Sequence, residues 1–159
     1  MGRSEQREAL SCVCQNDNGG SLLGARLEDP EVSEKSAGEK PSVSSYRDLL
    51  VWQKSMRLAV SSYTLTKAFP SDERFGLVSQ IRRSASSIPA NIAEGHGRRS
   101  TGAYLNHLSI ARGSLMELET HFLLAEELEF VGASEVGLLI EKTSEVSRML
   151  SGLIRSLER

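Results

Sequence analysis

Residues 104–125 read YLNHLSIARGSLMELETHFLLA, and their apolar side chains recur at alternating steps of three and four. This rhythm places the apolar residues on one stripe of an α-helix, where they can face a core. The stripe comprises Tyr104, Leu108, Ala111, Leu115, Leu118, Phe122 and Ala125. The stretch therefore predicts a long helix with one buried face.

Three other segments repeat this rhythm, and none alternates with the period of two that is typical of a strand. Their stripes are Leu49, Trp52, Met56, Ala59 and Tyr63; Val78, Ile81, Ala85, Ile88 and Ile92; and Val136, Leu139, Thr143, Val146, Leu150, Leu153 and Leu157. Aromatic residues are only 5% of the chain, which favours helices over a β-sandwich. The predicted fold class is therefore all-α.

Short segments at residues 69–73, 95–100 and 131–134 separate the four stripes. They supply Ser71 as a cap for the second helix, Ser100 or Thr101 for the third, and Ser134 for the fourth. Because loops this short join antiparallel neighbours, the sequence predicts an up-down four-helix bundle over residues 46–159.

A further set of large apolar residues lies off the four stripes. It comprises Leu50, Leu58, Leu65, Leu105, Ile110, Met116, Leu123, Leu124, Leu128, Ile140 and Ile154. Each of these residues can simply broaden a buried face. Together they indicate a second apolar surface, and a soluble monomer rarely exposes a large one, so we expect self-association.

Residues 1–45 differ from the rest of the chain. They are rich in Gly, Ser and acidic residues, contain Pro30 and Pro41, and show no sustained apolar period. Such a segment cannot bury enough apolar surface to offset the entropy of ordering, which predicts a low-order, disordered N-terminal extension. Whether this extension is functional or reflects a mis-assigned start is left open by the sequence.

The overall composition excludes several classes of protein. The formal net charge is −2, and no apolar run approaches the roughly 18 residues that a membrane span requires. The polar start of the chain is unlike a secretory signal, which predicts a cytoplasmic protein. Cys12 and Cys14 form a lone pair without the second pair that a closed zinc site needs, so we expect no metal.

The second predicted helix is unusual because Pro89 lies within its apolar stripe. A proline there removes one backbone donor and crowds the carbonyl four residues earlier, which predicts a kink. Ser86 and Ser87 can bond the freed carbonyls. Asn91 and Glu94 are polar beside apolar neighbours, and we expect them to tie the kink to adjacent helices rather than to catalyse a reaction.

The motifs around this kink resemble those of the four-helix-bundle family encoded in intervening sequences of bacterial 23S ribosomal RNA genes. The motifs are Trp52-Gln53-Lys54, Ser87-Ile88-Pro89-Ala90-Asn91-Ile92-Ala93-Glu94-Gly95, Tyr104-Leu105, Ile110-Ala111-Arg112-Gly113-Ser114-Leu115 and Glu117-Leu118-Glu119. The resemblance covers about residues 46–157 and excludes the N-terminal extension. The motif residues to which we assign a structural role are Trp52, Pro89, Asn91, Glu94, Gly95 and Glu117.

The resemblance carries its own expectations. Members of this family are up-down bundles that assemble as homopentamers, and most have no established biochemical activity. The family is similar to the accessory variability determinant of diversity-generating retroelements, a pentameric bundle that binds nucleic acid and a reverse transcriptase. The resemblance therefore implies a homo-oligomer, with RNA, DNA or a reverse transcriptase as possible partners.

Basic side chains gather on the second predicted helix and the loop that follows it, whereas acidic ones gather late in the third helix. The candidate nucleic-acid-binding residues are Arg82, Arg83, His96, Arg98, Arg99 and Arg112. A symmetric ring would repeat this basic patch along one rim, where weak phosphate contacts act together. The alternative is that these arginines pair with carboxylates of neighbouring helices.

No pattern in the sequence indicates an enzyme or a bound cofactor. His107 and His121 are fourteen residues apart, about 21 Å at helical rise, which is too far to share a metal. Neither histidine has a glutamate three residues before it, as a di-iron bundle would. We therefore expect a non-enzymatic protein that binds nucleic acid through an arginine-rich rim, or alternatively an adaptor for another protein.

Overall fold

The computed structural model describes residues 44–159. The predicted N-terminal extension, with Cys12 and Cys14, lies outside the described residues except for Ser44 and Ser45. Four α-helices span α1 (Leu50–Leu65), α2 (Leu77–His96), α3 (Thr101–Glu127) and α4 (Ala133–Leu157). Short 3₁₀ turns lie before and after α1, at η1 (Tyr46–Asp48), η2 (Thr66–Ala68) and η3 (Ser71–Arg74).

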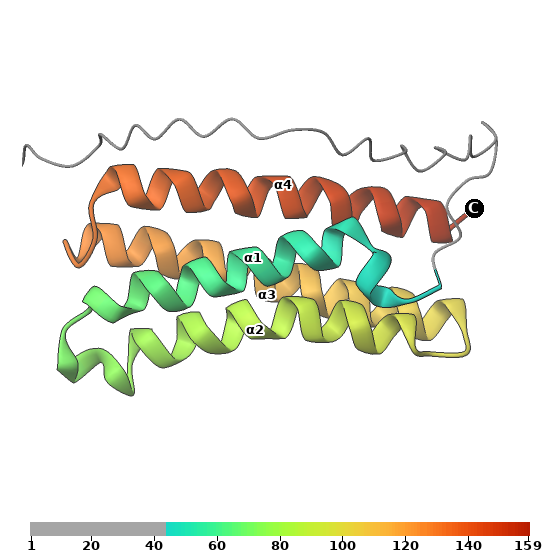
Figure 1. Cartoon of the computed structure of the whole chain (residues 1–159), viewed down its shortest axis with the longest axis horizontal. Helices are drawn as coiled ribbons and strands as arrows, with labels where there is room; N and C mark the ends of the chain where they lie inside the picture. The colour runs from blue at the N-terminus through green and yellow to red at the C-terminus, as the bar shows by residue number, and fades with distance from the viewer. Residues whose placement is uncertain (1–43) are drawn as a thin grey trace, which may run out of the picture. The chain divides into compact units, whose positions relative to one another are not determined.

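The four helices form an antiparallel up-down bundle, as Figure 1 shows. α1 packs against α2 and α4, and α3 packs against the same two helices. α1 and α3 therefore occupy opposite corners of the bundle. Within residues 44–159 there is no strand, so the all-α fold predicted from the sequence is confirmed. None of the described helices is long and apolar enough to cross a membrane.

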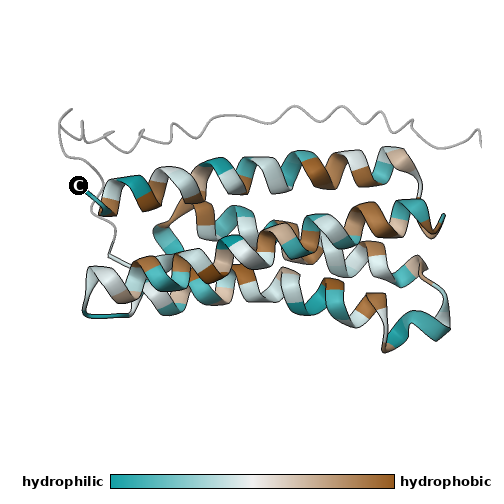
Figure 2. Ribbon diagram, turned by 180° about the vertical axis from the view of Figure 1, so that it is seen from behind, coloured by the Kyte–Doolittle hydropathy of each residue, from teal (hydrophilic) through white to brown (hydrophobic). Residues whose placement is uncertain are grey.

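Three of the four predicted stripes form the core. All five stripe residues of α2 are buried, as are those of α3 from Leu108 onward and those of α4 from Val136 to Leu150. Tyr104, Leu153 and Leu157, at the ends of their helices, are partly buried against this core. Figure 2 accordingly shows bands of apolar and of polar residues along each helix.

The predicted stripe of α1 is correct for Ala59, and Leu49 and Trp52 are partly buried against the core, but it is wrong for its other two residues. Its buried residues are Val51, Ser55, Leu58, Ala59 and Ser62. Met56 and Tyr63, which we predicted to face the core, are 39% and 43% exposed. Serine is compatible with the core here because Ser55 and Ser62 donate their hydroxyls to carbonyls of their own helix, those of Trp52 and Leu58, each at 2.8 Å.

The caps of the helices agree with the sequence only in part. Ser100 caps α3, accepting a hydrogen bond from the backbone N–H of Ala103. Ser71 does not cap α2, and Ser134 does not cap α4, because glycines occupy the two cap positions. Glutamates replace the missing cap side chains. Glu73 accepts a bond from the N–H of Leu77 at 2.8 Å, and a glutamate in the first turn of α4 accepts one from Gly132.

α2 is bent but continuous through the buried Pro89, as predicted. The neighbouring serines act differently from our expectation. Ser86 donates to the carbonyl of Arg83, and the Ser87 hydroxyl lies 2.8 Å from that of Ser114 on α3. The second bond joins α2 to α3 two residues before the proline.

Candidate nucleic-acid interface

Polar side chains join α2 to α3 beyond the bend. The amide nitrogen of Asn91 donates to the Ser87 carbonyl at 2.9 Å and to its hydroxyl at 3.1 Å. The amide oxygen of Asn91 lies 3.2 Å from Nδ1 of His107 on α3. Asn91 thus connects the bent part of α2 to the adjacent helix, the role that we predicted for it.

His107 continues this network toward the end of the bundle. Its Nε2 accepts a hydrogen bond from Nε of Arg98 at 3.1 Å and lies 3.7 Å from the carboxylate of Glu94. Arg98 also pairs directly with Glu94, one turn earlier. Because Nε2 accepts from an arginine, the proton lies on Nδ1, which then donates to Asn91. Both ring nitrogens of this neutral tautomer have partners.

Gly95 allows α2 and α3 to approach closely at this level. A Cβ atom added to Gly95 would lie 2.6 Å from Cδ2 of Tyr104 and 2.9 Å from Cβ of His107. The hydroxyl of Tyr104 is buried without a hydrogen-bond partner among residues 44–159, and burial raises the pKa of this phenol. His96 packs edge-on against the same ring, with centroids 6.1 Å apart.

The six predicted binding residues do not form one cluster. Arg82 lies in the first half of α2, donating to the Thr66 hydroxyl at 2.9 Å and stacking over a tyrosine of α1. Arg83 pairs with Glu117 of α3 at 2.8 Å. About 21 Å of helix separates Arg82 from His96. For Arg83, the alternative interpretation of an ion pair between helices is therefore correct.

Three of the remaining predicted residues, Arg98, Arg99 and Arg112, are exposed. Arg98 and Arg99 lie in the α2–α3 loop, and Arg112 lies on the exposed side of α3, level with the middle of the bundle. Arg98 is held by Glu94 and His107. Neither Arg99 nor Arg112 forms an ion pair with any other residue of the described bundle.

Three arginines that we did not predict lie at the same end of the bundle as the α2–α3 loop. Figure 1 shows that this end also holds the start of α1 and the end of α4. Arg47 of η1, together with Arg155 and Arg159 near the C-terminus, is exposed there. None of these three pairs with a carboxylate within residues 44–159. We call Arg47, Arg99, Arg155 and Arg159 the basic end.

Asp48 shows how η1 is fixed at this end. Its carboxylate accepts bonds from the backbone N–H groups of Ser45 and Ser44, at 2.9 and 3.2 Å, and from a serine hydroxyl. These bonds, chiefly the one from Ser45, lower the pKa of Asp48, and the nearby His96 adds to the effect. η1 therefore lies beside the C-terminal end of α2.

The opposite end of the bundle is acidic. It holds η3, the end of α3 and the start of α4. Its acidic residues are Asp72, Glu73, Glu126, Glu127, Glu129 and Glu135, against Lys67 and Arg74. Glu117 lies on α3 between the two ends, where its carboxylate is also 3.6 Å from Nε2 of His121. The charges of the bundle are thus divided along its axis.

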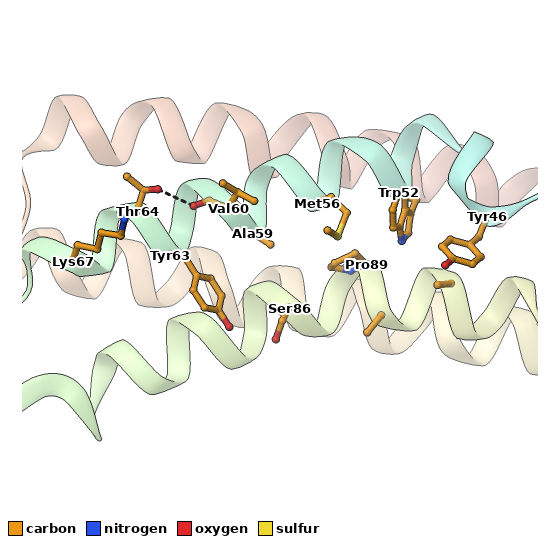
Figure 3. A pocket seen from close by; sticks show the side chains of 12 residues that line it. Tyr46, Trp52, Met56, Ala59, Val60, Tyr63, Thr64, Lys67, Ser86 and Pro89 are labelled. Atoms are coloured by element: carbon orange, nitrogen blue, oxygen red, sulfur yellow. Dashed lines mark hydrogen bonds between the residues drawn. The ribbon is translucent and has the colours of Figure 1, made fainter.

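An apolar groove runs between α1 and α2, as Figure 3 shows. Its volume is about 660 Å³. Its walls are Tyr46, Trp52, Met56, Ala59, Val60, Tyr63, Thr64 and Lys67 of the α1 side, and Ser86, Pro89, Ala90 and Ala93 of α2. Near one end of the groove, Trp52 packs edge-on against Tyr46, with the ring centroids 5.2 Å apart. Met56 and Tyr63, which we assigned to the core, line this groove instead.

No group of three or more potential metal ligands occurs in the described bundle. His121 keeps both ring nitrogens buried without a hydrogen-bond partner in this part of the chain. The histidines therefore differ in environment: His107 is fully bonded, His96 packs against a ring, and His121 lies beside Glu117.

Comparisons with known proteins agree with the fold and the motifs. A search of curated proteins found no match. The chain is similar to the crystal structure of a protein of unknown function from the S23 ribosomal protein family of Bacteroides thetaiotaomicron, with 28% identity and a TM-score of 0.62. That similarity covers 66% of this chain and 98% of the other. The family model of the 23S rRNA-intervening sequence protein matches residues 47–152. The chain belongs to the 23S rRNA-intervening sequence protein family.

Proposed function

We propose that this chain is a non-enzymatic, self-assembling bundle that binds nucleic acid through its basic end. The observation that supports this most directly is the meeting of Arg47, Arg99 and Arg155 at one end from three separate segments. All three are exposed and form no ion pair with other described residues. Guanidinium groups without a protein carboxylate are suited to bind phosphate oxygens.

The proposed contact is with the phosphate backbone rather than with bases. The aromatic rings near this end, Tyr46, His96 and Tyr104, are packed against other side chains. Stacking on unpaired bases requires exposed rings, so their packing favours binding without base preference. In the homopentamer that the family resemblance implies, five basic ends would act on one polyanion and multiply a weak affinity.

The non-enzymatic part of the proposal rests on where the reactive groups lie. In the part of the chain that the structure describes, no histidine and no carboxylate lines the groove between α1 and α2. The polar groups of Asn91, Glu94 and His107 bond to one another and to Arg98. Such mutual bonding favours a structural role in joining helices.

Replacing single arginines tests the proposal. We expect Arg47→Gln, Arg99→Gln and Arg155→Gln each to weaken binding to single-stranded RNA. Each should lower the slope of log K against log salt by about 0.7 per lost phosphate contact. Fluorescence anisotropy over 50–300 mM salt provides the measurement.

Arg74→Gln is the matched control. Arg74 is also exposed and pairs with no carboxylate in the described part of the chain, but it lies at the acidic end. Its variant should bind as the wild type does. An equal loss of RNA affinity from substitutions at both ends would contradict the assignment of the basic end. So would an RNA affinity that does not change with salt concentration.

A second candidate function is that of an adaptor for another protein, such as a reverse transcriptase. The observation that favours it is the exposed apolar surface formed by Met56, Val60 and Tyr63 in the α1–α2 groove. An adaptor would co-purify with its partner and show no affinity of its own for nucleic acid. Pull-down from the native host, followed by an RNA-binding assay of the isolated chain, separates the two functions.

A further inference from the structure

The bundle exposes a second apolar surface besides the α1–α2 groove. Two large apolar residues that lie on one side of α3, which we call the α3 ridge, are 44% and 47% exposed: Met116 and Leu123. The groove is concave and contains the small residues Ala59, Ala90 and Ala93, which leave room for an incoming helix. The α3 ridge is therefore convex, whereas the α1–α2 groove is concave.

The two surfaces face different directions. α1 and α3 occupy opposite corners of the bundle, since each packs on α2 and α4. One copy therefore cannot bring its own ridge into its own groove. A contact between the ridge of one copy and the groove of the next is head-to-tail, and such contacts form closed rings when the rotation between copies closes.

The spacing of residues on the two surfaces matches. Along α1 and η2, Met56, Val60, Tyr63 and Lys67 follow one another at steps of four, three and four. Along α3, Met116, Thr120, Leu123 and Glu127 follow at the same steps. Parallel helices in this register place Met56 opposite Met116, Val60 opposite Thr120 and Tyr63 opposite Leu123. At the end of the two series, a lysine lies opposite a glutamate.

The charges on the two surfaces are complementary. Among the described residues, Lys67 is the one charged residue that lines the groove. Glu127 is exposed one turn beyond Leu123 on the ridge. Neither residue forms an ion pair within residues 44–159. Opposite charges in matching positions select a partner and a register more than they add affinity.

We propose that the α3 ridge of one copy packs into the α1–α2 groove of a second copy, with Lys67 opposite Glu127. This inference rests on the self-assembly in the proposed function and specifies which surfaces produce it. It also assigns a role to the exposed stripe of α1, whose residues Met56, Val60 and Tyr63 contact solvent in the single chain.

Charge reversal tests the register. We expect Lys67→Glu and Glu127→Lys each to weaken self-association about tenfold, because like charges then oppose one another at every interface. The double variant with both changes should recover most of the wild-type association. Sedimentation velocity of the full chain between about 1 and 100 μM gives the association constants. Glu141→Lys, an exposed change on α4, is the matched control and should leave association unchanged.

Apolar-to-acid changes test the two surfaces separately. Val60→Asp in the groove and Leu123→Asp on the ridge should each reduce association about a hundredfold, since a carboxylate would be buried between copies. Both side chains are largely exposed in the single chain, at 63% and 47%, so both variants should fold, as circular dichroism would verify. Leu138→Asp on α4, where the leucine is 62% exposed, is the control that should assemble normally.

The outcomes separate this inference from the proposed function. A wild-type chain that stays monomeric at 100 μM overturns self-assembly and the interface together. A wild-type oligomer that survives both Val60→Asp and Leu123→Asp leaves self-assembly intact but overturns the interface. If Val60→Asp reduces self-association and Leu123→Asp does not, the groove packs on itself or on another protein. That result also overturns the head-to-tail contact.

Discussion

Gly95 illustrates how a single residue sets the distance between two helices. In an exposed helix interior, replacing glycine by alanine stabilises a protein by about 1 kcal/mol. At Gly95 the new methyl group would overlap the ring of Tyr104 and the Cβ atom of His107. The second of these atoms is attached directly to the backbone of α3, so it cannot move without the helix.

We therefore expect Gly95→Ala to lower the free energy of unfolding by about 1–3 kcal/mol, because overpacking exceeds the gain in helix propensity. Gly137→Ala is the matched control, since a Cβ atom added there meets nothing within 4 Å. It should raise stability by about 1 kcal/mol. Urea unfolding of the three proteins measures both effects. A Gly95→Ala variant as stable as Gly137→Ala would refute the close approach.

The roles of individual residues could be predicted from the sequence only in part. Asn91 and Glu94 stood out because polar residues beside an apolar stripe require partners. Their partner His107 could not be found in this way, because its position opposite Asn91 depends on how α2 and α3 are aligned. The ion pair between Arg83 and Glu117 also depends on how α2 and α3 are aligned, because 34 residues separate the two side chains in the sequence.

Among the elements, α2 combines a proline with an unbroken helix. Proline costs about 3 kcal/mol relative to alanine in a helix interior. Pro89 is nevertheless buried, and its ring packs in the bundle and lines the groove. Loss of about two ring methylenes would cost about 1.6 kcal/mol, and the unfolded chain would gain freedom.

These effects nearly cancel, so we expect Pro89→Ala to change the free energy of unfolding by less than about 1 kcal/mol. The new backbone N–H should donate to the carbonyl of Ala85 and reduce the bend of α2. Hydrogen exchange followed by NMR would show a protected amide at position 89. Destabilisation above about 3 kcal/mol, or an unprotected amide, would contradict this account of the bend.

The contrast between α1 and the other helices explains why one stripe was mispredicted. α2, α3 and α4 bury aliphatic side chains, and their stripes could be identified from hydrophobicity alone. α1 buries Ser55 and Ser62, whose hydroxyls bond within the helix, and it exposes Met56, Val60 and Tyr63. A pattern based on hydrophobicity therefore assigned Met56 and Tyr63 wrongly to the core, although Ala59 was assigned correctly.

At the scale of the whole molecule, the basic end depends on topology. Arg99 could be predicted because it lies in a visibly basic stretch, but Arg47 and Arg155 are isolated in sequence. The up-down connectivity brings them together, since the start of α1, the α2–α3 loop and the end of α4 share one end. The positions of the helices along the sequence are sufficient to derive this placement.

Self-assembly should also be visible in thermal stability. An oligomer that forms only from folded chains is stabilised by mass action, so its midpoint of unfolding rises with concentration. We expect a rise of about 5 °C or more between 1 and 100 μM for the wild type, and none for Val60→Asp. Differential scanning calorimetry tests this. A wild-type midpoint that is independent of concentration would argue against coupled folding and assembly.

The contacts described between α2 and α3 also determine how the bundle opens locally. Ser87 with Ser114, Asn91 with His107, and the close approach at Gly95 join these helices along much of their length. α1 and α4 are joined by polar contacts at Lys54 and Lys142, which lie nearer to solvent. We therefore expect fluctuations of the native state to detach α1 or α4 first and to leave the α2–α3 hairpin as the last cooperative unit to unfold. Arg99, in the loop of that hairpin, should then keep its position while α1 or α4 detaches and returns.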